Sequence, residues 1–257
     1  MGYALSKDTI VSAKRVLIIG PPDSGKTQSL LTWPRDLQYQ CYPGEKGDAT
    51  MPRHLSDVHV HTWTEPDPEH RLPSGTVVQE VEQRTWEILG GKYGKVRTFA
   101  GDGLHKYAGR VLDWISGGQL FRGEEIGAGG DQWASARIYN RAREHVRSYM
   151  QQVLASPVEY VTFTSWSGSE ADEPGVRGSG SHIYPDMFGK LAKEVVGDFG
   201  VSIYAVIDWA TRQPGKAATA TWQLLKEGKI WGSTIKVPLE VAMKMPVRIP
   251  QGLPHLE

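Results

Sequence analysis

Short apolar runs alternate along the chain with segments whose apolar residues recur at helical spacing. Residues 16–19 (Val-Leu-Ile-Ile) form an aliphatic run that predicts a buried strand. Further strands are predicted at 38–42, 58–63, 95–100, 158–164 and 201–207. Helices are predicted at 28–33, where Pro34 ends the helix, and at 77–89, 135–154 and 187–196. This alternation predicts a three-layer α/β fold with a mostly parallel sheet.

The C-terminal part of the chain has a different pattern. Residues 219–225 and 229–237 flank Lys226-Glu227-Gly228, a turn sequence that predicts a β-hairpin and therefore an antiparallel extension at one edge of the sheet. A chain of 257 residues fits one medium domain, 1–257, with its core at about 14–210 and the hairpin extension at about 211–257. Two glycine-rich segments, 116–133 and 166–182, lack periodicity and are predicted to be long loops, which in a compact domain are usually functional or disordered.

Charge and cysteine content restrict the classes of function. Lys+Arg and Asp+Glu both number 29, which argues against a surface coated in basic charge for non-specific nucleic-acid binding. The single cysteine, Cys41, cannot form an intramolecular disulfide and suits a reducing cytoplasm. The longest aliphatic run is too short to span a bilayer, and the N-terminus has no signal-peptide core. We therefore expect a soluble cytoplasmic protein with no membrane partner.

One motif is highly specific, because it matches G-x-x-x-x-G-K-[ST] in full and lies between a predicted strand and a helix start. It reads Gly20-Pro21-Pro22-Asp23-Ser24-Gly25-Lys26-Thr27, and Gln28 continues it into the helix. Glycines in such a P-loop let backbone N–H groups surround phosphate oxygens, and the helix N-terminus adds a favourable dipole. We expect Lys26 to reach the β- and γ-phosphates and the Thr27 hydroxyl to bind Mg²⁺. The motif predicts ATP and Mg²⁺ as cofactors.

Two carboxylates are candidates for the rest of the catalytic site. Asp102 follows the predicted 95–100 strand and is the best candidate for a second Mg²⁺ ligand, with Asp208 as the fallback and a plain turn aspartate as the alternative. Glu45 follows the second strand, and the ends of adjacent parallel strands converge on one crevice. Glu45 is therefore the candidate to orient the attacking water, and a surface turn glutamate is the alternative.

The order of these features resembles a known group. The P-loop, the Pro43–Gly47 turn, Asp102, a long helix, a strand that ends in Thr164-Ser165 and a final hairpin resemble phage-encoded ATPases with a RecA-like core. These are the AAA-labelled phage NTPases, which include the Sak-type single-strand-annealing recombinases. The resemblance covers roughly residues 14–246. It implies that Glu45 activates water, that Asp102 holds Mg²⁺ and that Thr164 or Ser165 senses the γ-phosphate.

The resemblance also implies partners. It implies a homo-oligomer, ring or filament, in which a neighbouring subunit supplies cations to the ATP site. Arg212 and Lys216 match by position, Lys236 is a second choice, and ordinary solvated charges are the alternative. Single-stranded DNA would bind the loops at 116–133 and 166–182, alongside a single-strand-binding protein. Each loop carries one arginine against three acidic residues, the wrong balance for a polyanion.

These observations together predict Mg²⁺-dependent ATP binding and hydrolysis, coupled to phage DNA recombination or annealing in the host cytoplasm. Two alternatives stay open. One is a motor subunit for DNA packaging or unwinding, and the other is a nucleotide-gated assembly protein with no direct DNA role.

Overall fold

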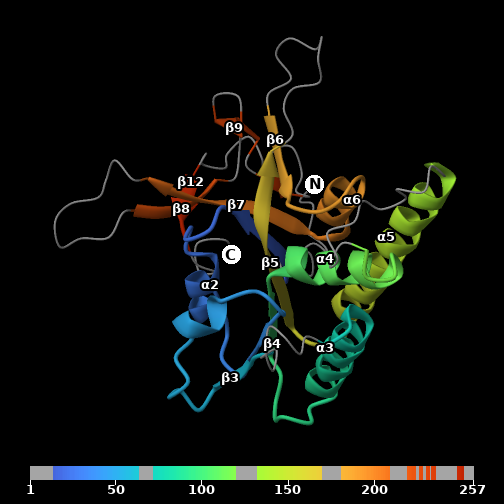
Figure 1. The fold of residues 1–257 in the computed structure, drawn as a ribbon. Helices are drawn as coiled ribbons and strands as arrows, with labels where there is room; N and C mark the ends of the chain where they lie inside the picture. Colours follow the sequence, from blue (N-terminus) through green and yellow to red (C-terminus); the bar gives the residue numbers. More distant parts are fainter. Residues whose placement is uncertain are drawn as a thin grey trace, which may run out of the picture.

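A twisted, mostly parallel sheet organises the chain, as the computed structural model shows (Figure 1). The structure describes residues 14–63, 72–119, 132–169, 181–208, 219–223, 226–227, 230–231, 233–235 and 248–251. Its strands are β1 (Arg15–Gly20), β2 (Leu37–Cys41), β3 (Val58–His61), β4 (Thr98–Asp102), β5 (Tyr160–Ser169), β6 (Ser181–Pro185), β7 (Val201–Asp208), β8 (Thr219–Gln223), β9 (Lys226–Glu227), β10 (Ile230–Trp231), β11 (Ser233–Ile235) and β12 (Arg248–Pro250).

The strand order across the main sheet is β12-β8-β7-β1-β5-β4-β2-β3. The six strands from β7 to β3 in this order are parallel to their neighbours. Strands β8 and β12 add to the β7 edge in antiparallel orientation. This confirms the predicted α/β class, with a mostly parallel sheet and an antiparallel extension.

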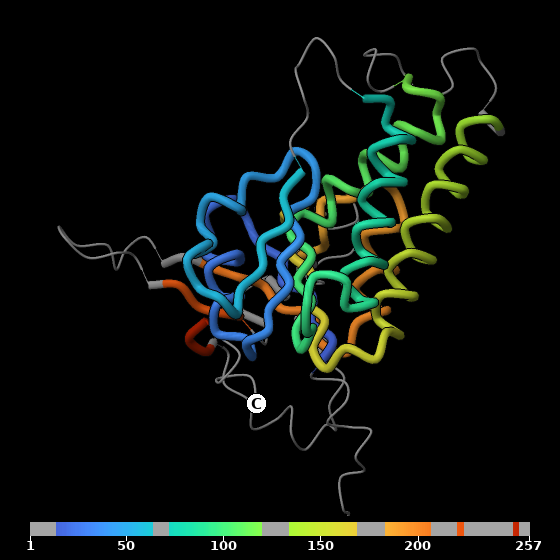
Figure 2. Tube along the Cα trace, turned by 90° about the horizontal axis from the view of Figure 1, so that it is seen from below, coloured from blue at the N-terminus to red at the C-terminus, as the bar shows by residue number. Residues whose placement is uncertain are grey.

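The helices are divided unequally between the two faces of the sheet. They are α2 (Lys26–Ser29), α3 (Ser74–Leu89), α4 (Leu104–Ile115), α5 (Gln132–Leu154) and α6 (Leu191–Asp198), with the 3₁₀ turns η1 (Leu30–Thr32) and η2 (Gly47–Thr50). Helices α3, α4 and α5 lie together on one side of the strands (Figures 1 and 2). The short α2 and η1 cover the other side, which we call the α2 face.

Alternation along β1 explains both layers. Leu17 and Ile19 pack into the core shared with the long helices, whereas Val16 and Ile18 pack with Leu30 on the α2 face. The helical stripes predicted within residues 77–89 and 135–154 are confirmed, because their side chains are buried, with Ile138 partly buried. The predicted stripe residues are Val78, Val81, Thr85 and Ile88 on α3, and Ile138, Ala142, Val146, Tyr149 and Val153 on α5. Among the described residues, no helix is long and apolar enough to cross a membrane.

One helix was not predicted. Helix α4 begins directly after Gly103, whose left-handed backbone (φ 91°) starts the helix without a capping side chain. The Gly101-Asp102-Gly103 sequence indicated a turn that ends a strand, but β4 continues through Asp102 because Gly101 and Asp102 pair with β2. The glycines serve close packing here: a Cβ on Gly101 would lie 2.8 Å from the Phe163 ring.

The predicted C-terminal hairpin is present at its turn, but it is shorter than predicted. Strands β8 and β11 pair with successive parts of β7 and not with each other. Within the described residues, the antiparallel pair around the predicted turn consists of the two-residue strands β9 and β10. The turn sequence does reverse the chain between β9 and β10. The flanking strands β8 and β11 instead form their backbone hydrogen bonds with the open edge of β7.

The predicted loop at 166–182 is partly strand. Strand β5 continues to Ser169 and pairs antiparallel with β6, with Gly168 opposite Tyr184. Residues 170–180 of this predicted loop, and 120–131 of the other, lie outside the described residues.

Candidate nucleotide site

The P-loop joins β1 to α2 and has the backbone that its glycines predict. Asp23 and Gly25 both adopt left-handed conformations, with φ values of 60° and 80°. A Cβ on Gly20 would lie 2.6 Å from Ser24 Oγ and 2.8 Å from the Ala205 carbonyl oxygen, so glycine is required there. Residues 22–28 line a cleft of about 620 Å³. The P-loop motif therefore forms one wall of a cavity large enough for a nucleotide.

Lys26 lies at the floor of this loop. Its ammonium group donates to the carbonyl oxygens of Gly20 (2.9 Å) and Pro21 (2.6 Å). Burial lowers the pKa of Lys26 to about 8, and the nearby carboxylates of Asp102 and Glu45 oppose that shift. The loop thus holds a cation among backbone groups, where an anionic ligand would favour its charged form.

Asp102 lies beside Thr27. The Thr27 hydroxyl donates to Asp102 Oδ2 at 2.8 Å, although the two residues are 75 positions apart in the sequence. Tyr39 donates to the same carboxylate oxygen, and Thr164 donates to the other one. Asp102 is 2% exposed. Three hydroxyl groups therefore fix one buried carboxylate beside the P-loop.

This oxygen-rich set fits Mg²⁺. Magnesium is a hard cation that proteins bind through one or two carboxylates together with substrate phosphates and water. Within the described part of the chain, no group of three His, Cys, Asp or Glu side chains could hold a metal. A metal at Asp102 and Thr27 would depend on phosphate oxygens for its remaining ligands, which is the mode typical of Mg²⁺ in nucleotide sites.

Gly47 closes the other side of this cluster. A Cβ on Gly47 would lie 2.0 Å from Asp102 Oδ2, 2.6 Å from the Tyr39 hydroxyl and 3.0 Å from Thr27 Oγ1. The backbone of η2 therefore approaches the carboxylate more closely than any side chain would allow.

Gly47→Ala is expected to displace the Asp102 carboxylate and to raise the Mg²⁺ concentration that half-saturates ATP turnover by about tenfold, since overpacking costs roughly 1–3 kcal/mol. A Mg²⁺ titration of turnover measures this. The matched control is Gly109→Ala, because that glycine lies on the exposed side of α4 and an added Cβ would meet no atom within 4 Å. An unchanged Mg²⁺ requirement in Gly47→Ala would contradict the arrangement.

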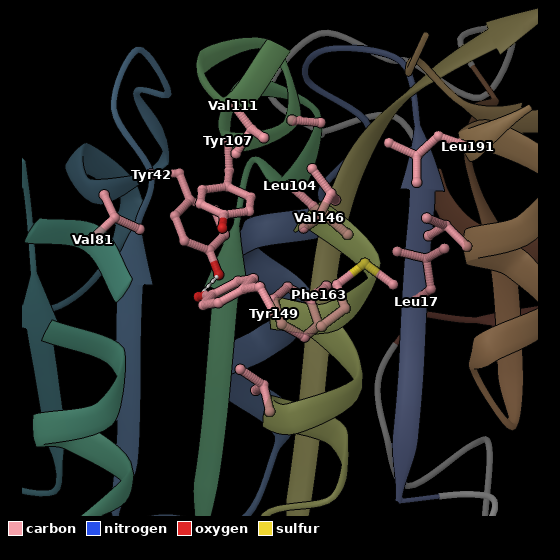
Figure 3. Close-up of a cluster of buried hydrophobic side chains, with 14 of the residues drawn as sticks. Leu17, Tyr42, Val81, Leu104, Tyr107, Val111, Val146, Tyr149, Phe163 and Leu191 are labelled. Carbon is pink, nitrogen blue, oxygen red and sulfur yellow. Dashed lines mark hydrogen bonds between the residues drawn. The ribbon is translucent and has the colours of Figure 1, made fainter. Parts of the chain in front are cut away.

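Glu45 lies in the same cleft as Lys26 and Asp102. Its backbone N–H donates to the Tyr42 carbonyl at 3.0 Å, and Tyr42 is itself anchored by a hydrogen bond between its hydroxyl and that of Tyr149 on α5 (Figure 3). Burial raises the pKa of the Glu45 carboxyl. A Cβ on Gly103 would lie 2.9 Å from Glu45 Cβ, so this glycine leaves room for the glutamate. The two predicted acids therefore do converge on the P-loop.

The two residues predicted to sense the γ-phosphate make different contacts. Thr164 contacts Asp102 and accepts a hydrogen bond from the Gly103 N–H at 3.1 Å. Ser165 is buried, and its hydroxyl donates to the carbonyl of Trp166 at 3.1 Å, so it turns back to its own strand. Thr164, not Ser165, belongs to the cluster. The predicted trans-acting cations, Arg212 and Lys216, lie outside the described residues, as does the side chain of Asp208.

Three side chains at or beside the cleft were not predicted from the sequence to be part of the site. Tyr39 reaches Asp102 from β2, and Lys106 on α4 lines the cleft with its ammonium 4.2 Å from the centre of the Trp166 ring. His105, also on α4, lies beside Glu45. The apolar residues of α4 recur at helical spacing, so this helix could have been predicted from the sequence. That prediction would have placed His105 and Lys106 about one helical turn after Asp102.

Comparison with known proteins supports no family assignment, because no protein-family model and no curated protein matches the chain. Among solved structures, the chain is similar to an ATPase from the type III secretion system of pathogenic bacteria, with a TM-score of 0.43, 16% identity, and coverage of 76% of this chain and 51% of that chain. It is also similar to the ATPase EscN of the type III secretion system of enteropathogenic E. coli, with a TM-score of 0.40, 15% identity, and coverage of 76% and 43%.

This chain therefore spans about half or less of the length of those two ATPases. Its own strand order and P-loop geometry define its fold, a mixed α/β P-loop fold with a mostly parallel central sheet.

Proposed function

We propose that the chain binds ATP and hydrolyses it in a Mg²⁺-dependent reaction. The observation that carries the proposal is the contact between Thr27 and Asp102, at 2.8 Å, in the cleft that also contains Lys26 and Glu45. Phosphoryl transfer needs positioning and electrostatic stabilisation more than covalent chemistry, and these four side chains supply both.

Each residue has a distinct role in this proposal. Lys26 contacts the β- and γ-phosphates and stabilises the charge that develops on them. Thr27 and Asp102 hold Mg²⁺, which when bound neutralises phosphate charge. Glu45 orients the attacking water, and its raised pKa makes it a better proton acceptor than an exposed glutamate. Thr164, on β5, donates to Asp102 and in this proposal senses the γ-phosphate.

The test is ATP turnover by the wild-type chain across a Mg²⁺ titration, with Asp102→Asn beside it. The amide keeps the shape of the carboxylate but loses its charge, so we expect Asp102→Asn to need about tenfold more Mg²⁺ and to turn over more slowly. Measuring ATP affinity in the absence of Mg²⁺ controls for folding, since that affinity should change little. A wild-type chain that hydrolyses no ATP at any Mg²⁺ concentration would refute the proposed function.

The proposal extends to DNA metabolism and to assembly. From the resemblance in motif order, we propose that hydrolysis serves phage DNA recombination or annealing on single-stranded DNA. We also propose that the chain forms a homo-oligomer in which Arg212 or Lys216 completes a neighbour's site. The discriminating measurement is turnover with and without single-stranded DNA: stimulation supports a DNA role, and strand annealing without translocation separates recombination from a motor. Turnover that DNA leaves unchanged favours a nucleotide-gated assembly protein.

A further inference from the structure

His105 occupies an unusual position at the start of α4. Its side chain is 5% exposed, and its Nε2 atom has no hydrogen-bond partner among the described residues. A buried polar atom without a partner costs free energy, and in native structures such an atom calls for an explanation. The Glu45 carboxylate lies beside this nitrogen, with its Oε2 3.8 Å from Nε2.

The other ring nitrogen determines which atom carries the proton. The backbone N–H of Trp166 donates to His105 Nδ1 at 3.3 Å, so Nδ1 is an acceptor and carries no hydrogen. Burial lowers the pKa of His105 to about 3, which keeps the ring neutral. The single ring proton is therefore on Nε2, the atom beside Glu45.

Trp166 holds the imidazole in this orientation. Its indole stacks on the His105 ring with 4.7 Å between ring centroids and an interplanar angle of 28°. The neighbouring Lys106 places its ammonium 4.2 Å from the centre of the same indole. His105 and Lys106 therefore both contact the indole of Trp166. Trp166 is the last residue of β5 that pairs with β1, and it lines the nucleotide cleft.

We propose that His105 is a positioning residue for Glu45: Trp166 fixes the ring, and Nε2–H holds the Glu45 carboxylate in the orientation that activates water. The proposal rests on the proposed ATPase function. The present separation is longer than a hydrogen bond, and a movement of about 0.8 Å by the Glu45 side chain would close it. Trp166 belongs to β5, as Thr164 does, so the strand that contacts Asp102 also sets the position of the glutamate.

Two substitutions separate positioning from packing. His105→Phe keeps a ring that can stack on Trp166 but removes both nitrogens, whereas His105→Gln places an amide N–H near the position of Nε2. We expect His105→Phe to lower kcat by about 10- to 100-fold with unchanged ATP affinity, since small misplacements of a reacting group have effects of this size. His105→Gln should recover most of the lost turnover.

The Tm of His105→Phe separates the two roles, because a packing role predicts a lower Tm and a positioning role does not. Replacing an unpartnered buried donor by an apolar ring of similar shape should leave the Tm of His105→Phe unchanged or raised while turnover falls. Parallel losses of turnover and Tm in both variants would show a packing role and overturn the inference. Turnover in His105→Phe equal to that of the wild type would also overturn the inference. A wild-type chain that hydrolyses no ATP refutes the proposed function, and this inference with it. An active wild-type chain whose His105→Phe variant is equally active refutes this inference alone.

Discussion

Lys26→Ala is expected to abolish ATP hydrolysis, with turnover falling by at least about 10²–10³-fold, because it removes the preorganised cation that meets the charge on the transferring phosphate. The loss should appear in nucleotide affinity as well, since Lys26 contacts phosphates in the bound ground state as well as during the reaction. Steady-state turnover and direct ATP titration measure the two effects.

The structure supplies a control for Lys26→Ala. Lys26 is buried and its ammonium donates to two carbonyls of the P-loop, so the substitution also removes hydrogen bonds that shape the loop. Lys95→Ala removes the same charge from a side chain that is 79% exposed and should leave both affinity and turnover unchanged. Turnover in Lys26→Ala that equals the wild type would refute the nucleotide site itself.

Glu45→Gln is expected to separate binding from hydrolysis. The amide preserves size but cannot accept the proton of the attacking water, and general-base catalysis contributes about 10²–10⁴-fold. Turnover should therefore fall by about that factor while ATP affinity is retained, so that the variant traps bound ATP. Rapid-quench measurement of a single turnover, beside equilibrium ATP binding, gives both quantities.

Glu80→Gln serves as the matched control, because Glu80 is exposed on α3 and lies outside the nucleotide cleft. Normal hydrolysis by Glu45→Gln, together with an inactive variant of another carboxylate in the cleft, would mean that the base has been assigned to the wrong residue.

The parts of the site that the sequence predicted are those that follow buried strands. The aliphatic run marks β1, and strands were also predicted at 38–42 and 95–100, close to β2 and β4. Parallel strands bring their carboxyl ends to one edge, so the P-loop, Glu45 and Asp102 could be expected to meet. The sequence did not determine which face of the sheet Thr164 and Ser165 each lie on. On β5, Val161 and Phe163 belong to the helical core, which leaves Thr164 on the α2 face with Asp102. The period of two therefore selects Thr164 over Ser165, but only once the buried face is known.

Helix α4 has apolar residues at helical spacing, but the glycines before it obscured where it begins. Its first turn follows two glycines, which normally indicate a chain reversal, and here they serve close packing instead. The pairing of β8 and β11 with β7 depends on a free sheet edge that no local turn sequence encodes. In both cases, tertiary contacts decide how a turn-forming sequence is used.

The position of β1 in the sheet has a consequence for how the chain folds. Both partners of β1 come from the distant half of the sequence, β5 at residues 161–166 and β7 at residues 201–204. Gln251 adds a later contact, since its side-chain amide donates to the Ser24 carbonyl at 2.8 Å. Closing such long loops carries an entropic cost before any contact is gained. On the ribosome, the P-loop sequence therefore emerges long before the neighbours that shape it, and a nascent chain that ends near residue 150 leaves both edges of β1 unpaired. The P-loop is synthesised before both neighbours of β1, and its site can form only after they follow.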